Sequence, residues 1–392
     1  MGRAAAGRDP ALDCARGIAI ALVVAHHAAA VAGPHPGSSE AVPLLRGFID
    51  AGHTGVTLFF VLSGFLISRP FIARALGGPP VHLSTYFARR ALRILPLYVP
   101  AVLIAAALAA HGPLDLRRAV PHLFFLTPFG RAAAPLWPHS AVWWSLAPEV
   151  QFYLALPLVA WLSARLGGLR FVLVLVMAAA VAYVALLGVW LPMSIPTAIG
   201  LKLSLPGRGF AFAAGAGLAW LDVRRGEKLR GVLGSVGVLR AGGTDVVFAG
   251  LLVGFAALLA TVASDGFWVW EADWRHAWHL IESLVWTSLI ALLLYAPLRL
   301  RAAVVNRPLV ALGRASFPLY LVHLPILVAL LPWLAVKIGV GAGTAIAVAV
   351  CLAIAAIVHA LVERPILAYS ARIGAKSKAP PASPAYGATR AR

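Results

Sequence analysis

The chain has 392 residues, of which 61% are hydrophobic and only 12% are charged, and its mean hydropathy is +0.87. A soluble domain is nearer half apolar and a quarter charged, so this composition excludes an ordinary water-soluble fold and indicates contact with lipid. The formal net charge of +19 would suggest a nucleic-acid partner on a soluble surface, so the position of the charges along the chain matters more than their sum.

Ten apolar runs follow one another along the chain. A helix needs about 20 apolar residues to cross the hydrocarbon core of a bilayer. The predicted spans are Ala11–Ala32, Gly52–Ile72, Ile94–Ala110, Leu146–Ser163, Phe171–Val189, Gly209–Leu221, Val246–Ala263, Ala277–Pro297, Ser316–Val336 and Gly343–Val362. The sixth is short and rich in small residues, which suit close helix packing. We therefore expect an all-α, polytopic transmembrane bundle of about ten helices.

Lys and Arg are distributed unevenly between the loops. If the N-terminus is placed in the cytoplasm, 25 of the 33 basic residues fall in inside segments and 8 in outside segments. This bias predicts that both termini are cytoplasmic. The excess charge then faces the anionic inner leaflet, so no nucleic-acid partner is needed. Residues 1–372 are expected to form a single transmembrane domain, and the basic, Pro/Ala/Ser-rich residues 373–392 a disordered cytoplasmic tail.

The first span carries Arg16 and His27, two polar residues in an apolar helix. They are eleven residues apart, about three turns, so they share one face and lie about 16 Å apart along the axis. His26 is rotated away by about 100°. Polar groups in a span are costly and need a reason. The functional interpretation is a polar path that ends at His27, and the alternative is a snorkelling arginine with a core histidine bonded to a backbone carbonyl.

The third and fourth spans carry further charged residues. Glu149 and Gln151 lie near the outer end of the fourth span, where a carboxylate could hydrogen-bond an imidazole. The alternative is that Glu149 lies at the N-terminus of this helix simply because the helix dipole favours a carboxylate there. Arg89, Arg90 and Arg93 group on one helical face at the cytoplasmic end of the third span. Such a group can bind phosphates, or it can simply fix the topology.

The ninth span opens with Ser316, Tyr320 and His323 at positions i, i+4 and i+7, which form one stripe. They would line a polar site, or they are polar groups satisfied within the bundle. Ser63 lacks the G-x-S-x-G pattern of a hydrolase nucleophile. No His/Cys cluster has metal-ligand spacing, so no metal site is expected.

Together these pieces resemble the membrane-bound acyltransferase-3 family, the O-acyltransferases that modify sugars and related metabolites. The resemblance runs in order from residue 12 to residue 365, and Thr57 stands where many members carry Asp, which leaves an acidic partner from the second span in doubt. The residues that carry the resemblance are Leu12–Asp13–x–x–Arg16–Gly17, His27, Gly55–Val56–x–x–Phe59–Phe60–Val61–Leu62–Ser63–Gly64–Phe65, Arg89–Arg90–x–x–Arg93, Trp144–Ser145–Leu146, Glu149–x–Gln151–Phe152–Tyr153, Ser316–x–x–Leu319–Tyr320–x–x–His323 and Glu363–Arg364–Pro365.

The resemblance implies transfer of an acyl group from cytoplasmic acyl-CoA, with acetyl-CoA the expected co-substrate, to a hydroxyl of a sugar, glycan or glycosylated metabolite. No bound cofactor is expected. His27 would be the general base, because a hydroxyl needs one near neutral pH, and Glu149 would orient or polarise it. The remaining residues divide into donor-binding arginines, which are Arg16, Arg89, Arg90 and Arg93, and an acceptor or acyl pocket of Gln151, Tyr153, Ser316, Tyr320 and His323.

Two other functions use the same residues. A transporter or flippase would employ the buried polar groups as a solute path, and a receptor or scaffold would need no chemistry. The Ala- and Arg-rich composition is consistent with a bacterium of high GC content, hence with the bacterial inner membrane. The acceptor, the acyl chain length and the oligomeric state leave no signal in the sequence.

Overall fold

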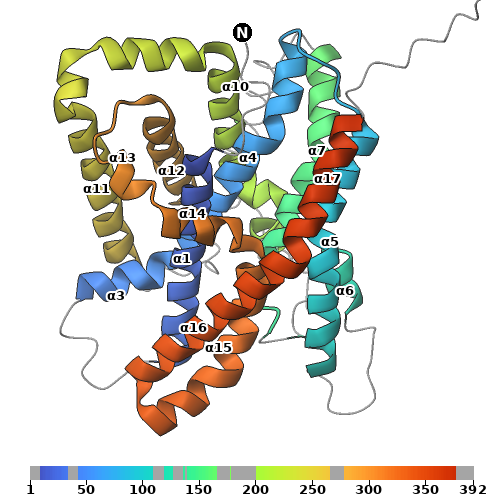
Figure 1. The fold of residues 1–392 in the computed structure, drawn as a ribbon, viewed down its shortest axis with the longest axis vertical. Helices are drawn as coiled ribbons and strands as arrows, with labels where there is room; N and C mark the ends of the chain where they lie inside the picture. Colours follow the sequence, from blue (N-terminus) through green and yellow to red (C-terminus); the bar gives the residue numbers. More distant parts are fainter. Residues whose placement is uncertain are drawn as a thin grey trace, which may run out of the picture.

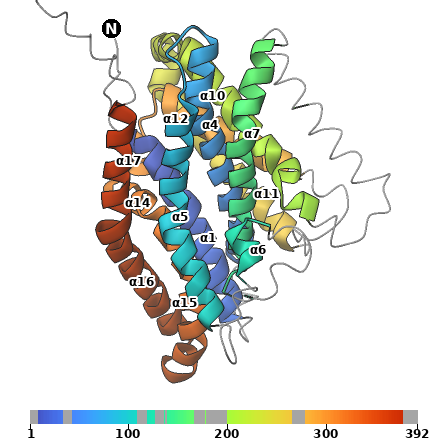
Figure 2. The ribbon, with the colours of Figure 1, turned by 90° about the vertical axis from the view of Figure 1, so that its right-hand side faces the viewer.

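The computed structural model describes residues 9–33, 43–108, 119–126, 136, 139–165, 177, 200–264 and 278–376. Within these ranges the regular elements are helices, and no strand is present. The long helices stand side by side along the long axis of the molecule, and α15 and α16 form a hairpin at its lower end (Figures 1 and 2). The predicted all-α bundle is confirmed.

The elements of the first half are α1 (Pro10–Ala32), α3 (Pro43–Asp50), η1 (Ala51–His53), α4 (Thr54–Ala75), α5 (Leu83–Leu108), α6 (Val120–Leu123), η4 (Trp143–Ser145) and α7 (Leu146–Arg165). Those of the second half are α10 (Leu205–Ser235), η5 (Leu239–Gly243), α11 (Thr244–Ser264), α12 (Trp278–Tyr295), α13 (Arg301–Val304), α14 (Arg307–Arg314), α15 (Ser316–Ile338), α16 (Val340–Val358), η7 (His359–Glu363) and α17 (Arg364–Lys376). Both η5 and η7 have π-helical hydrogen bonding.

Among the described residues, eight helical segments are long and apolar enough to cross a membrane, and each matches a predicted span. The predicted fifth span, Phe171–Val189, lies outside the described residues. The predicted sixth, Gly209–Leu221, is part of α10, a helix of 31 residues that is not among the eight. Its second half carries the charged cluster Asp222, Arg224, Arg225, Glu227, Lys228 and Arg230, and this charge explains why α10 as a whole does not have the composition of a span.

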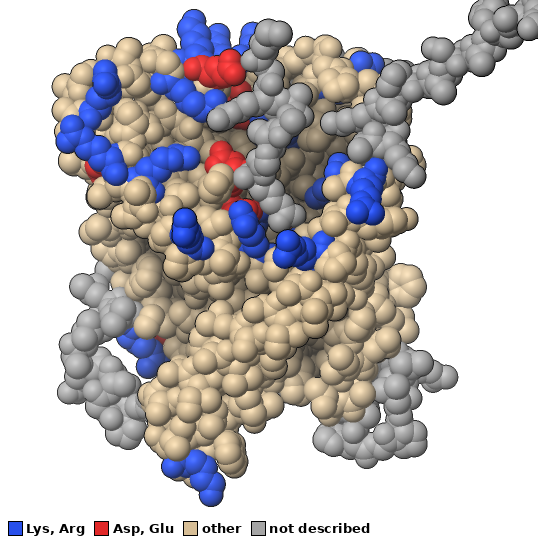
Figure 3. Space-filling model, viewed as in Figure 1, with Lys and Arg blue, Asp and Glu red and all other residues tan. Residues whose placement is uncertain are grey.

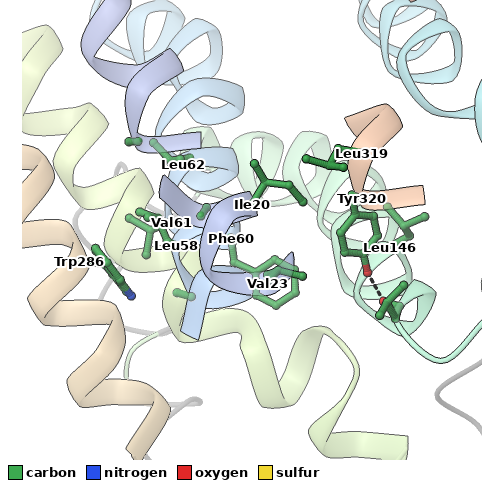
Figure 4. Packing of buried hydrophobic residues seen from close by; sticks show 14 of the residues in the cluster. Ile20, Val23, Leu58, Phe60, Val61, Leu62, Leu146, Trp286, Leu319 and Tyr320 are labelled. Atoms are coloured by element: carbon green, nitrogen blue, oxygen red, sulfur yellow. Dashed lines mark hydrogen bonds between the residues drawn. The ribbon is translucent and has the colours of Figure 1, made fainter. Parts of the chain in front are cut away.

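The centre of the bundle is the packing of α4 against α1 on one side and α10 on the other. Glycines make this close approach possible. A methyl group at Gly55 would overlap the Ala19 carbonyl of α1, and one at Gly64 would overlap the backbone of Phe212 in α10. Figure 4 shows side chains of α1 and α4 filling the space between these helices. In lipid, such contacts hold helices together through van der Waals packing more than through the hydrophobic effect.

On the face shown in Figure 3, most of the visible Lys and Arg side chains gather over the upper half of the molecule. Several of them pair with acids there. Asp222 of α10 lies 2.7 Å from an Arg69 nitrogen and 3.5 Å from an Arg230 nitrogen. In the predicted orientation, the upper end of the molecule would face the cytoplasm. The helix α17 continues to Lys376, so the first residues of the predicted tail are helical, and residues 377–392 lie outside the described part of the chain.

Candidate functional site

The start of α1 holds the predicted donor-binding residue Arg16 in an ion pair. Asp9 caps the helix by accepting a hydrogen bond from the Ala11 nitrogen, and Pro10 occupies the first turn, where a missing N–H costs nothing. One turn later, Asp13 is fully buried; its carboxylate lies 2.7 Å from Arg16 Nη1 and 3.3 Å from Arg314 Nε. The Asp13–Arg16 pair lies within α1, and the Asp13–Arg314 pair ties α1 to the end of α14.

Three turns further along α1, His27 meets His323 of α15. His27 Nδ1 lies 2.8 Å from the Val23 oxygen and 3.4 Å from His323 Nε2. His323 Nδ1 in turn lies 2.9 Å from the Tyr320 oxygen and 3.1 Å from the Leu319 oxygen. A carbonyl oxygen can only accept, so both Nδ1 atoms carry a proton. His323 Nε2 then accepts from His27, and His27 Nε2 keeps a lone pair with which it can act as a base.

Two more imidazoles continue from this pair toward α12. The rings of His27 and His323 are 5.1 Å apart between centroids, those of His26 and His27 4.9 Å, and those of His26 and His53 5.9 Å. We refer to His323, His27, His26 and His53 as the histidine row. Sequence reasoning selected His27 and His323 but did not connect them, and it missed His53, because their proximity depends on how three separate elements cross.

The predicted partner of His27, Glu149, instead contacts a different pair of hydroxyls. Glu149 Oε1 accepts hydrogen bonds from Ser63 Oγ, at 3.0 Å, and from the Tyr153 hydroxyl. No hydrogen bond joins Glu149 to His27 within the described ranges. Ser63, set aside at the sequence level as a nucleophile, is thus a hydrogen-bond donor to this carboxylate.

Two of the predicted arginines lie beside the Glu149 group. The Arg90 guanidinium lies over the Tyr153 ring at 5.7 Å, and its buried Nε has no hydrogen-bond partner among the described residues. Arg93 donates to Glu363 of η7 and lies 5.3 Å from the Phe317 ring centroid. Short π-helical segments such as η7 are frequent at functional sites. Arg89, the third arginine of the group, makes no hydrogen bond or ion pair inside the described part of the chain.

The remaining predicted pocket residues have mostly local partners. Gln151 Oε1 accepts from the Leu205 nitrogen at 2.7 Å, which caps the start of α10. The Tyr320 hydroxyl lies 2.8 Å from Ser145 Oγ and donates to the Val142 oxygen, beside Leu146 and Leu319 in Figure 4. Ser316 is buried at the start of α15. Of these, Tyr320 lies nearest the histidine row, with its ring centroid 6.0 Å from that of His323.

An acid that sequence reasoning missed lies against Thr57. Glu282 of α12 is fully buried, and Thr57 Oγ1 donates to its Oε2 at 2.9 Å. Position 57 is a threonine where many members of the family that the chain resembles carry Asp. In this chain the carboxylate beside that position comes from Glu282 of α12. A signal for it was available, because an acid in the middle of an apolar span is costly without a specific partner.

A family model described as an acyltransferase domain matches residues 9–360. The chain belongs to this acyltransferase family. The match includes every site residue predicted from the sequence, from Arg16 in α1 to His323 in α15, and it confirms the family predicted from the motifs.

Two curated relatives share part of the chain. It is 31% identical over 124 residues to "Nodulation protein 10" of Rhizobium leguminosarum bv. viciae, and 35% identical over 107 residues to "Exopolysaccharide production protein ExoZ" of Rhizobium meliloti (strain 1021). These matches cover 27% and 26% of this chain, and it spans about a third, 32%, of the length of each relative. The comparison with solved structures gave no match.

Proposed function

We propose that this protein is a membrane O-acyltransferase of the bacterial inner membrane that moves an acyl group, the acetyl group being expected, from cytoplasmic acyl-CoA to a hydroxyl of a sugar or glycan. The observation that carries the proposal is the His27–His323 pair, in which the proton on His27 Nδ1 is fixed and Nε2 is left as a base. The family match gives the reaction class.

The reaction proceeds by direct transfer. His27 Nε2 takes the proton of the acceptor hydroxyl while the oxygen attacks the thioester carbonyl. The new C–O bond forms and the C–S bond breaks. The thiolate leaves and recovers the proton from the His27 imidazolium, so protons balance. His323 accepts a hydrogen bond from Nδ1 throughout, which orients the ring and supports its positive charge.

The donor is assigned to the end with the arginines. Arg90 and Arg93 lie in α5 near Tyr153, and a guanidinium binds phosphate oxygens in a bidentate fashion. Arg90 Nε has no hydrogen-bond partner among the described residues, so this guanidinium is the first candidate for the phosphates of CoA. Arg93 already pairs with Glu363, so its contribution to donor binding is through its charge. Arg16, paired with Asp13, extends the basic mouth toward α1.

A polysaccharide is the proposed class of acceptor, since one relative's name refers to exopolysaccharide production. The test is release of CoA thiol by the purified protein with acetyl-CoA, with and without oligosaccharide fragments of a bacterial exopolysaccharide. Acceptor-dependent release, with an acetylated product by mass spectrometry, is expected. A transporter or flippase would release no thiol with any acceptor, and that result would reject the proposal.

A further inference from the structure

Glu282 is a buried carboxylate that the proposed reaction does not use. It lies in α12 with no exposed surface. Its Oε2 accepts from Thr57 Oγ1 at 2.9 Å, and His279 Nδ1 lies 2.7 Å from the same oxygen. Burying a carboxylate costs free energy unless it is paired, and both recorded partners of Oε2 are neutral or titratable groups. Keeping the Glu282 carboxylate charged among these partners is costly, which is a reason to expect a function for it.

The other oxygen of Glu282 faces the histidine row. Glu282 Oε1 lies 3.8 Å from His53 Nε2, and His53 Nδ1 lies 3.4 Å from the Asp50 oxygen. A carbonyl can only accept, so Nδ1 carries a proton, and Nε2 can donate to the carboxylate only when the ring is protonated on both nitrogens. The close approach depends on Gly52, where a methyl group would press on the His26 Cβ. Glycine at this position therefore brings His53 beside His26.

Other charged groups near this array are compensated or act elsewhere. Asp50 acts on His26 electrostatically but is paired with Arg46 at 3.1 Å and is partly exposed. Arg208 of α10 acts electrostatically on His279, the other imidazole beside Glu282. Glu282 is thus the buried acid that stands at the end of the row.

We propose that Glu282 is a positioning residue for the histidine row: its buried negative charge faces His53 and stabilises the proton that His27 takes from the acceptor. The inference rests on the proposed function, because it assumes that His27 is the base. No hydrogen bond between ring nitrogens joins His26 to His27 or to His53 in the described part of the chain. The effect is therefore electrostatic, and Glu282 itself gains and loses no proton.

The pH dependence of transfer tests this directly. A base works only while it is unprotonated, so the rate falls on the acid side. With Glu282→Gln, a proton on the row loses the stabilising charge, and a lower pH is needed to protonate it. We expect the acid limb of kcat/KM to move to lower pH by about half a unit or more. The maximal rate should fall about threefold to tenfold, because a weaker base accepts the proton less readily. Glu282→Asp, which keeps the charge, should restore both toward the parent.

Thr54→Val is the matched structural control. Thr54 accepts a hydrogen bond from Trp286 Nε1 at 2.9 Å across the same interface between α4 and α12. This variant removes a cross-helix hydrogen bond without changing charge, so the acid limb should stay at the parent pH. If the Gln variant fails to fold, Glu282→Asp against Glu282→Asn makes the same comparison of charge.

All variants are measured as purified protein in nanodiscs, with acetyl-CoA as donor, an oligosaccharide that the parent acetylates as acceptor, and size-exclusion profiles as the folding control. A folded Glu282→Gln protein with the parent's acid limb would overturn the inference and leave the proposed function intact. An equal shift in Thr54→Val would overturn it as well, since the effect would then be structural. An acid limb that persists in His27→Ala would instead refute His27 as the base, and with it the inference.

Discussion

The two polar regions of the bundle differ in the kind of charge that they hold. At the arginine end, Arg16 and Arg93 carry permanent charges and are fixed in ion pairs with Asp13 and Glu363. At the histidine row, the side chains are imidazoles, which can accept or donate a proton, and His27 Nε2 remains available as a base. Permanent charges suit the binding and orientation of an anionic donor, and titratable groups suit proton transfer. We therefore propose that the donor binds at the arginine end and that proton transfer takes place at the histidine row.

The largest expected effect is the loss of His27. We predict that His27→Ala lowers the transfer rate by 10²-fold or more, because general-base help is typically worth about 10²–10⁴ in rate, while donor binding is retained. His26→Ala is the matched control, since it removes the neighbouring ring but not the base. Turnover and acetyl-CoA binding of purified variants would be measured. Equal losses in both variants would remove the distinction between the two histidines.

Glu149→Gln tests whether the carboxylate between the two regions contributes to the chemistry. Glu149 accepts from Ser63 and Tyr153, so its loss leaves those hydroxyls without a charged acceptor. We predict a fall in kcat of about tenfold to 100-fold, smaller than that of His27→Ala, because charge-assisted hydrogen bonds are worth about 1.5–3 kcal/mol. Ser63→Ala removes one donor to the same carboxylate and should have a weaker effect. A Glu149→Gln protein with the parent's kcat would limit this residue to a structural role.

Arg90→Ala examines the binding end. We predict that the KM for acetyl-CoA rises about tenfold while the KM for the acceptor changes less than threefold, since a guanidinium–phosphate contact is lost. Arg93→Ala should act in the same direction and also destabilise the protein, because it removes the arginine partner of the buried Glu363 and leaves it with His359. Arg74→Ala is the control, because among the described residues Arg74 donates a hydrogen bond to the Gly78 oxygen alone. An unchanged donor KM in both Arg90→Ala and Arg93→Ala would leave membrane topology as the role of these charges.

Gln151→Leu is expected to have the smallest effect on catalysis. Its side chain accepts from the Leu205 nitrogen, so the variant should lose about 1 kcal/mol of stability with less than a twofold change in acceptor KM. Thermal unfolding and acceptor titration would be compared. A large increase in acceptor KM without loss of stability would return Gln151 to the acceptor pocket predicted from the sequence.

Much of the fold could be predicted from the sequence, because a helix that crosses a lipid bilayer needs about 20 mainly apolar residues. Eight predicted spans coincide with helices of suitable length and composition. The difficult case was α10, where Gly209–Leu221 is short and apolar but the helix continues into a charged segment. A hydropathy pattern reports which residues tolerate lipid. It does not report where a helix ends, because backbone hydrogen bonds can continue through polar residues.

The candidate site was predictable where it lies along one helix and not where helices cross. The spacing of Arg16 and His27, and that of Tyr320 and His323, follows from helical periodicity. The contact of His27 with His323 joins residues 296 positions apart, and the contact of Thr57 with Glu282 joins residues 225 apart. Pairings of this kind depend on interhelical packing and glycine contacts, for which a single sequence provides no register.

The most direct test of the central assignment, His27 as the base, is the rate of acetyl transfer against pH for the parent and His27→Ala measured together in nanodiscs. The parent should lose activity as the pH falls through the range in which an imidazole becomes protonated, because imidazolium cannot accept the hydroxyl proton. The residual rate of His27→Ala should be at least 10²-fold lower, the loss of general-base help, and should lack that acid limb. A well-folded His27→Ala protein with the parent's rate and the parent's acid limb would contradict the mechanism.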